Sequence, residues 1–156
     1  MSSAVVFPLV IYYDAACPLC AAEMHALRDH DRDGVLQLVD CSAPGFVDAE
    51  ASAAGIATPD LLRRIHARDA AGRWFVGVEV FVLAYRAAGL MGAARLWSHP
   101  RLRPLWDRLY PWIADNRQWL SRLGLSRAYG WLLGLMARRA QRRASACSDG
   151  NCRTPL

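Results

Sequence analysis

Cys17 and Cys20 form a Cys-x-x-Cys pair where an apolar, strand-like run, Val5 to Tyr13, gives way to a segment with helical spacing. Residues three apart on a helix are neighbours, with Cβ atoms about 5–6 Å apart. A disulfide needs Cα atoms about 4.4–6.8 Å apart. The pair can therefore open and close as a disulfide with little backbone movement.

The two sulfurs are not expected to be equivalent. Cys17 stands at the expected N-cap, where unpaired backbone N–H groups and the positive end of the helix dipole favour a thiolate. Pro18 suits the first helical position, where its missing N–H costs nothing. Cys20 shares an inward stripe with Met24 and Leu27 at i, i+4, i+7 spacing. We therefore expect Cys17 to be an exposed nucleophile and Cys20 the shielded thiol that resolves a mixed disulfide.

The same cysteine spacing also occurs as half of a zinc site. Cys147 and Cys152, in a polar tail, could complete a four-cysteine site with Cys17 and Cys20. The tail pair could instead relay electrons to the first pair through a disulfide, or take no part. A strand before the motif and a proline-led helix after it favour redox chemistry over metal binding.

Asp14 lies at the exit of the expected strand, just before the cysteine motif. Its carboxylate could act as a general base toward Cys20, although its charge would oppose a thiolate at Cys17. The alternative is that it orders the loop by accepting backbone hydrogen bonds. Two parallel strands would also bring Asp40 and Cys41 close. We interpret Cys41 as a buried small residue, with a third redox thiol as the alternative.

The segment Tyr13-Asp14-x-x-Cys17-Pro18-x-Cys20 resembles the signature of the DCC-type thiol-disulfide oxidoreductases, named for Asp-x-x-Cys-x-x-Cys. Further similar segments are Ile65 to Arg73, Gly77-Val78-Glu79-x-Phe81, and Tyr110-x-x-Ile113-Ala114-x-Asn116-Arg117. The similarity covers roughly residues 7–123. Ala15 and Glu79 depart from the family, which usually has Gly and Asp there. The resemblance implies a thioredoxin-like fold and dithiol chemistry, with substrates that are largely undefined.

Length and composition fit one ordinary domain, since the chain has 156 residues with 54% apolar and 21% charged. All 19 basic residues are arginine, and they are unevenly spread. Residues 1–90 hold 7 arginines and 11 acids, whereas residues 91–156 hold 12 arginines and 3 acids. The basic half could meet an anionic partner, but a solvated helix face is the simpler interpretation. Without a nucleic-acid-binding motif, we expect no nucleic-acid partner.

The N-terminal apolar run is too short to span a membrane and lacks signal-peptide flanks, so we read it as a buried strand. We expect a cytoplasmic protein. In that reducing compartment a cysteine pair is usually catalytic, sensory or metal-binding rather than a structural staple.

The pattern predicts an α/β fold, with a thioredoxin-like β-α-β-α-β-β-α core over residues 5–90. Strands are expected at 7–13, 35–39, 65–69 and 74–76, and helices at 18–31, 47–54, 58–62 and 78–88. Thioredoxins usually carry a cis-proline before the third strand. Pro59 is too far ahead to serve, so we expect backbone near Arg64 and Ile65 to face Cys17.

A helical extension packed on the core is expected over residues 91–143, and a flexible cysteine-containing tail over 144–156. Pro104 suits a helix start, whereas Pro111 should kink or restart the helix. The last helix, beginning near Ser126, should pack against the domain. The alternative is a peripheral membrane contact through its apolar face and arginines.

These features together predict a thiol-disulfide oxidoreductase of the protein-disulfide reductase type, with Cys17, Cys20 and Asp14 as its catalytic residues. The partner would be a disulfide-containing protein or a small-molecule thiol. No bound organic cofactor is required, because the dithiol holds the electrons. The alternatives are a zinc protein and a non-catalytic interaction module on the same scaffold. Nothing in the sequence indicates the oligomeric state.

Overall fold

The sheet is built around its first strand, in a computed structural model that describes residues 4–123 and 131. The strands are β1 (Leu9–Tyr13), β2 (Leu36–Asp40), β3 (His66–Arg68) and β4 (Trp74–Val76). Their order is β2-β1-β3-β4. β1 runs parallel to β2 and antiparallel to β3, which is antiparallel to β4. β1 therefore has a partner on each side.

Both faces of β1 are covered, which explains its unbroken apolar sequence. Leu9, Ile11 and Tyr13 belong to one hydrophobic cluster. The alternate residues Val10 and Tyr12 belong to a second cluster on the opposite face.

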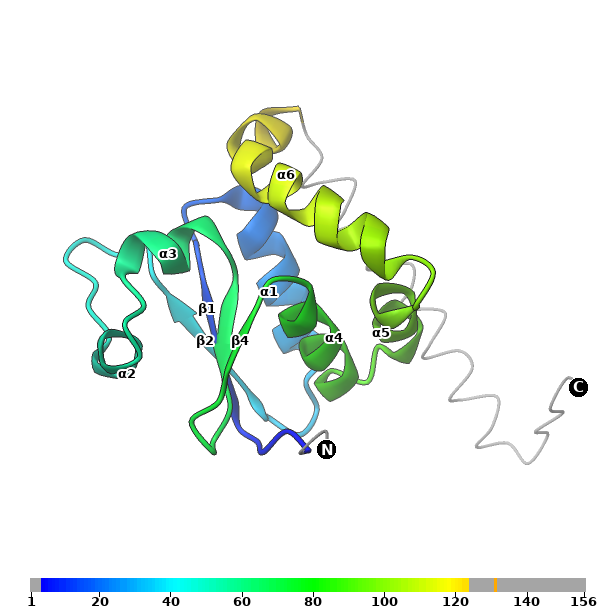
Figure 1. Ribbon diagram of the computed structural model, residues 1–156, viewed down its shortest axis with the longest axis horizontal. Helices are drawn as coiled ribbons and strands as arrows, with labels where there is room; N and C mark the ends of the chain where they lie inside the picture. Colours follow the sequence, from blue (N-terminus) through cyan, green and yellow to red (C-terminus); the bar gives the residue numbers. More distant parts are fainter. Residues whose placement is uncertain (1–3, 124–130, 132–156) are drawn as a thin grey trace, which may run out of the picture.

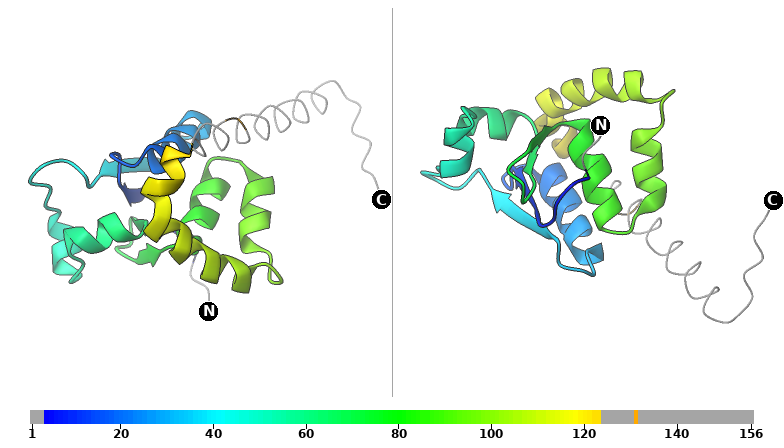
Figure 2. Two further views of the ribbon diagram at one scale, coloured as in Figure 1. Left: turned by 90° about the horizontal axis from the view of Figure 1, so that it is seen from above. Right: turned by 60° about the horizontal axis from the view of Figure 1, so that its bottom comes forward.

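Helices form a layer on each side of the sheet (Figures 1 and 2). They are α1 (Pro18–His30), α2 (Ala49–Ala53), α3 (Thr58–Arg63), α4 (Val78–Ala87), α5 (Met91–Ser98) and α6 (Arg103–Arg122). α1, α4 and α5 contribute to the first cluster, and α2 and α3 to the second. The arrangement confirms the expected α/β, thioredoxin-like fold and the order of its core elements.

The extension differs from its prediction in one respect. α6 continues through Pro111 as a single helix, which excludes a restart there, whereas the alternative of a kink stays a prediction. Apart from residue 131, the predicted helix after Ser126 lies outside the described residues, as does the tail with Cys147 and Cys152. The division at residues 90 and 143 stays a prediction. Within the described ranges, no helix is long and apolar enough to cross a membrane.

α6 is fixed to the core by Tyr110. Its hydroxyl accepts a hydrogen bond from the backbone N–H of Ile65, with 2.9 Å between N and O. Its ring packs edge-on to Phe81, with centroids 5.6 Å apart. Gly77, which precedes α4, has φ 70° and leaves room for this ring, since a Cβ there would lie 3.2 Å from Tyr110. α6 therefore crosses above the turn that joins β1 to α1 (Figure 1).

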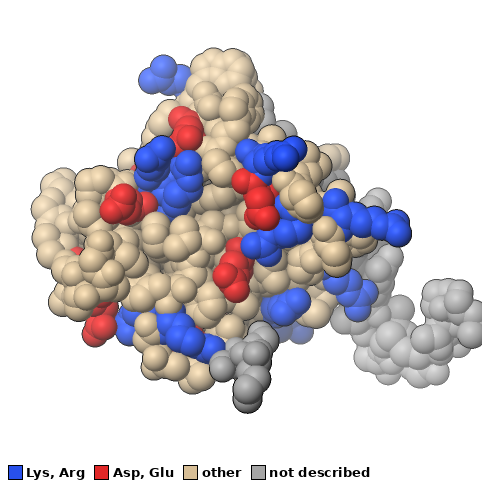
Figure 3. Space-filling view, in the orientation of Figure 1, with Lys and Arg blue, Asp and Glu red and all other residues tan. Residues whose placement is uncertain are grey.

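Figure 3 shows the charged side chains of the described residues on one face of the molecule. Arginine side chains on that face are interspersed with aspartate and glutamate side chains. Six of the twelve arginines of residues 91–156 lie outside the described residues. The interpretation of the basic half as a solvated surface, and the alternative of an anionic partner, therefore stay predictions.

Candidate active site

Cys17 is the N-cap residue of α1, as predicted. Its Sγ accepts a hydrogen bond from the backbone N–H of Cys20, with 3.4 Å between the two atoms. Pro18 follows as the first residue of the helix. Both cysteines are free thiols in this structure. The strand-to-helix junction therefore places Cys17 over the positive end of α1.

Asp40, at the end of β2, orders the loop between β1 and α1. Its Oδ1 accepts hydrogen bonds from the N–H of Ala15 at 3.2 Å and from the hydroxyl of Ser42 at 2.6 Å. Ser42 Oγ in turn accepts from the N–H of Ala16 at 3.2 Å. The parallel register of β1 and β2 pairs Tyr13 with Asp40, which brings this carboxylate to the loop. The role proposed for the Asp14 side chain in ordering the loop is therefore filled by Asp40.

The expected exposure of the cysteines is wrong. Cys17 has 0% of its surface exposed, whereas Cys20 is partly exposed. The cause is α6, which packs over the N-terminus of α1. Ser121 Oγ lies 4.0 Å from Cys17 Sγ and accepts a hydrogen bond from the N–H of Leu19 at 3.3 Å.

The backbone near Arg64 and Ile65, which was expected to face Cys17, forms a hydrogen bond with another residue instead. The N–H of Ile65 is bonded to Tyr110, and the group against the Cys17 sulfur is the Ser121 hydroxyl. The cis peptide bond within the described residues is Phe7–Pro8, at the opposite end of β1 from the cysteines.

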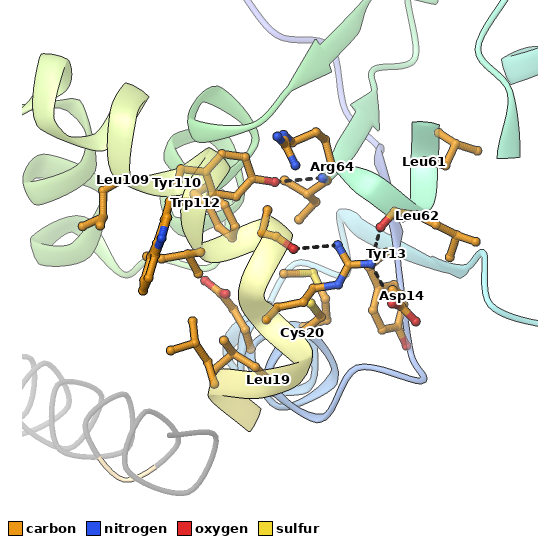
Figure 4. A pocket seen from close by; sticks show the side chains of 18 of the residues that line it. Tyr13, Asp14, Leu19, Cys20, Leu61, Leu62, Arg64, Leu109, Tyr110 and Trp112 are labelled. Carbon is orange, nitrogen blue, oxygen red and sulfur yellow. Dashed lines mark hydrogen bonds and ion pairs between the residues drawn. The ribbon is translucent and has the colours of Figure 1, made fainter. Parts of the chain in front are cut away.

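Arg117 of α6 forms an ion pair with Asp14 beside the cysteines. Its Nη2 lies 2.9 Å from Asp14 Oδ2, and the side chains are only 16% and 9% exposed. The guanidinium also donates to the carbonyls of Leu62 and Arg63. Figure 4 shows hydrogen bonds ending at Asp14 and Leu62. Asp14 Oδ1 and Arg117 Nε are buried without hydrogen-bond partners.

The surroundings of the two thiols lower the pKa of Cys17 and raise the pKa of Cys20. The pKa of Cys17 falls from an ordinary 9.0 to about 6, first because the Cys20 thiol donates a hydrogen bond to it. The Cys20 backbone N–H, the Ser121 hydroxyl and the charge of Arg117 also lower this pKa, and burial opposes them. The pKa of Cys20 is raised by its hydrogen bond to Cys17, by burial and by the negative charge of Cys17. At neutral pH the thiolate is therefore on Cys17 and the proton on Cys20.

This difference predicts a thiolate that titrates near pH 6 in the reduced protein. Ultraviolet absorbance of the thiolate should rise with that midpoint, and Cys17→Ser should remove the transition. Because the folded pKa lies below the unfolded value of 9.0, the thiolate stabilises the fold fully above 9.0 and this contribution is lost as pH falls through about 6. An unchanged transition in Cys17→Ser would contradict the assignment.

A cavity of about 310 Å³ lies beneath α6 and has Cys20 in its wall. Its polar lining includes Asp14, Glu23 and Arg117, and most of the remainder is aliphatic or aromatic. Glu23 accepts a hydrogen bond of 2.6 Å from the buried Tyr85 hydroxyl. Figure 4 shows Leu109 and Trp112 on one side of this space and Leu61 and Leu62 on the other.

The other cysteines do not join this site within the described residues. Cys41 is 1% exposed, and burial is the main cause that raises its pKa to about 12. This confirms its interpretation as a buried small residue. In the described part of the chain, no group of three or more His, Cys, Asp or Glu side chains could hold a metal. Cys147 and Cys152 lie outside that part, so the four-cysteine hypothesis remains untested.

The chain was compared with models of known protein families, with curated proteins and with solved structures. Residues 11–123 match the family model of the DCC1-like thiol-disulfide oxidoreductases. No curated protein and no solved structure gave a match. The matched span runs from β1 to the end of α6, so it contains Cys17 and Cys20 together with Asp14, Arg117 and Ser121.

Proposed function

Because the chain belongs to the DCC1-like thiol-disulfide oxidoreductase family, we propose that it reduces substrate disulfides through Cys17 and Cys20. One observation carries the proposal. The Cys17 sulfur caps α1, accepts hydrogen bonds from Cys20 and has a pKa lowered to about 6. A thiolate at neutral pH with a protonated thiol beside it is the arrangement that dithiol exchange requires.

The reaction proceeds in two exchanges. The Cys17 thiolate attacks one sulfur of the substrate disulfide, and the other substrate sulfur leaves as a thiolate. Cys20 then loses its proton and attacks Cys17 Sγ, which breaks the mixed disulfide and releases the second substrate sulfur. The substrate gains two electrons, and the enzyme keeps a Cys17–Cys20 disulfide. Asp14 Oδ1, buried and without a partner, is proposed as the acceptor of the Cys20 proton.

The reaction requires α6 to move, because this helix covers Cys17. Since Cys17 has no exposed surface, a substrate sulfur reaches it only after the Ser121 end of α6 moves aside. Ser121 lies in the last turn of α6, which ends at Arg122. The ends of helices open at lower free energy than their centres, so this part of α6 is suited to the movement. The predicted cytoplasmic location and the preference for protein disulfides stay predictions.

A single-turnover experiment tests the proposal without an electron donor. The reduced chain is mixed with an excess of a fluorogenic peptide that contains one internal disulfide. We expect about one disulfide reduced per wild-type chain, because one dithiol supplies two electrons. The double variant Cys17→Ser/Cys20→Ser should reduce none.

Peptide mapping should then find the new disulfide between Cys17 and Cys20. No reduction by the wild type, or a disulfide that excludes either cysteine, would contradict the proposal. Stoichiometric zinc in the purified protein would favour the alternative four-cysteine metal site.

A further inference from the structure

The cavity beneath α6, here called the Cys20 pocket, has features that the two exchange steps do not use. Its volume is about 310 Å³, and it is lined by Cys20 but not by Cys17. Small-molecule sites usually measure about 300–1,000 Å³ and are mostly apolar with a few polar groups. The Cys20 pocket has this character, since its charged lining is confined to Asp14, Glu23, Arg64 and Arg117 and most of the remainder is aliphatic or aromatic.

The position of the pocket suits a small molecule rather than a protein. α6 lies above it and contributes Leu109 and Trp112 to its wall, while α3 contributes Leu62 (Figure 4). With α6 in place, Cys17 has no exposed surface, whereas Cys20 is partly exposed. A compact molecule in the pocket therefore lies against Cys20 without the movement of α6 that access to Cys17 requires.

The lining also limits the charge of the occupant. Phe81, Trp97 and Tyr110 present aromatic rings, with centroid distances of 5.0 Å for Phe81–Trp97 and 5.6 Å for Phe81–Tyr110. The charged lining residues are already engaged, Arg64 with Asp115, Arg117 with Asp14 and Glu23 with the Tyr85 hydroxyl. A carboxylate or ammonium group on the occupant would therefore lose its hydration at high cost. An aromatic or alkyl body would gain free energy by leaving water.

We propose that the Cys20 pocket binds the apolar body of an uncharged, low-molecular-weight thiol that reduces the Cys17–Cys20 disulfide. This inference rests on the proposed function and supplies its electron donor. The bound thiol, as its thiolate, attacks Cys20 Sγ, the disulfide breaks, and Cys17 leaves as a thiolate. A second thiol attacks the sulfur of the first, releases a low-molecular-weight disulfide and leaves Cys20 to regain a proton. Two thiols lose two electrons and two protons, and the enzyme gains both.

The sulfur of the Cys17–Cys20 disulfide that is attacked is determined by which cysteine leaves more readily as a thiolate. Thiol exchange is faster when the departing sulfur has a lower pKa. Cys17 is stabilised as a thiolate at the N-terminus of α1 and by the Ser121 hydroxyl. Attack at the Cys20 sulfur therefore releases the better leaving group.

Binding is tested first, with a probe that has no redox activity. The thioether diphenyl sulfide is titrated onto the reduced full-length chain, and ligand-observed NMR reports binding. Saturable binding is expected, with Trp112→Ala weakening it about tenfold because an aromatic wall is lost. The matched control is Trp119→Ala. Both tryptophans lie on α6, with 52% and 57% exposure, but Trp119 does not line the pocket.

Reduction is tested next, with two uncharged alkanethiols. The oxidised chain is mixed with benzyl mercaptan or with 2-mercaptoethanol, and the loss of the Cys17–Cys20 disulfide is followed. The benzyl thiol should show saturation and react about tenfold faster at low concentration, since its ring is bound before exchange. Trp112→Ala should remove this advantage, whereas Trp119→Ala, outside the pocket lining, should keep it.

Several results overturn the inference. They are absence of saturable diphenyl sulfide binding, equal weakening by Trp119→Ala, and equal rates for the two thiols. Affinity that falls as protein concentration rises would assign the pocket to a second copy of the chain. Each of these results leaves the single-turnover reduction by Cys17 and Cys20 unaffected, so failure of the donor site and failure of the proposed function are distinguishable.

Discussion

Cys17→Ser is expected to lower the rate of disulfide reduction by about a thousandfold or more, because it removes the nucleophile. Cys20→Ser is expected to retain the first exchange and stop with substrate attached to Cys17. The reason is the unequal acidity of the two thiols. In the intact pair the Cys17 pKa is lowered to about 6 and that of Cys20 is raised. Cys17→Ser removes the thiol and the charge of Cys17 that contribute to the Cys20 shift, but burial still raises the Cys20 pKa, so Cys20 should remain a poor attacking thiolate at neutral pH.

Rapid mixing with acid quench, followed by mass spectrometry, separates the two variants. Cys20→Ser should accumulate a mixed disulfide that maps to Cys17, and Cys17→Ser should accumulate none. Cys41→Ser is the matched control, since this thiol is buried in the second cluster and has a pKa raised to about 12. It should react like the wild type. Equal residual activity in Cys17→Ser and Cys20→Ser would refute the assigned roles.

The cysteine motif could be predicted because its determinants are local. The helical spacing of Cys20, Met24 and Leu27 and the first-turn Pro18 define α1, and the apolar run before them defines β1. The parallel pairing of β1 with β2 is a general property of such a unit. These rules correctly predicted that Cys17 would cap the helix.

The cover over the cysteines could not be predicted in the same way. Arg117 and Ser121 meet Asp14 and Cys17 across sequence separations of 103 and 104 residues. Periodicity identified α6 but carried no information on where the helix would lie. The prediction that Cys17 is exposed treated the start of α1 as a free helix end, and it failed because α6 packs there. One available signal was Arg117, which lies in a segment that resembles the family and could have been paired with a buried carboxylate.

Arg117→Met is expected to reduce the free energy of unfolding by about 3–5 kcal/mol, because it leaves the Asp14 carboxylate buried without its cation. The pair is only 16% and 9% exposed, so solvent screens it little. Arg63→Met is the matched control. Arg63 forms an exposed pair with Asp115, at 3.7 Å with 69% and 47% exposure. Exposed pairs contribute about 0–1 kcal/mol, so the control should change stability little.

Urea denaturation of the single variants and of Asp14→Asn/Arg117→Met separates the ion pair from packing. The double variant should be about 1–3 kcal/mol more stable than the sum of its single changes predicts, because the unpaired charge is removed. A purely structural role for Arg117 would leave the acidity of the cysteine unchanged. Since the charge of Arg117 lowers the Cys17 pKa, the thiolate midpoint of Arg117→Met should instead rise above about 6. An additive cycle with an unchanged midpoint would remove Arg117 from the site and leave α6 as a steric cover alone.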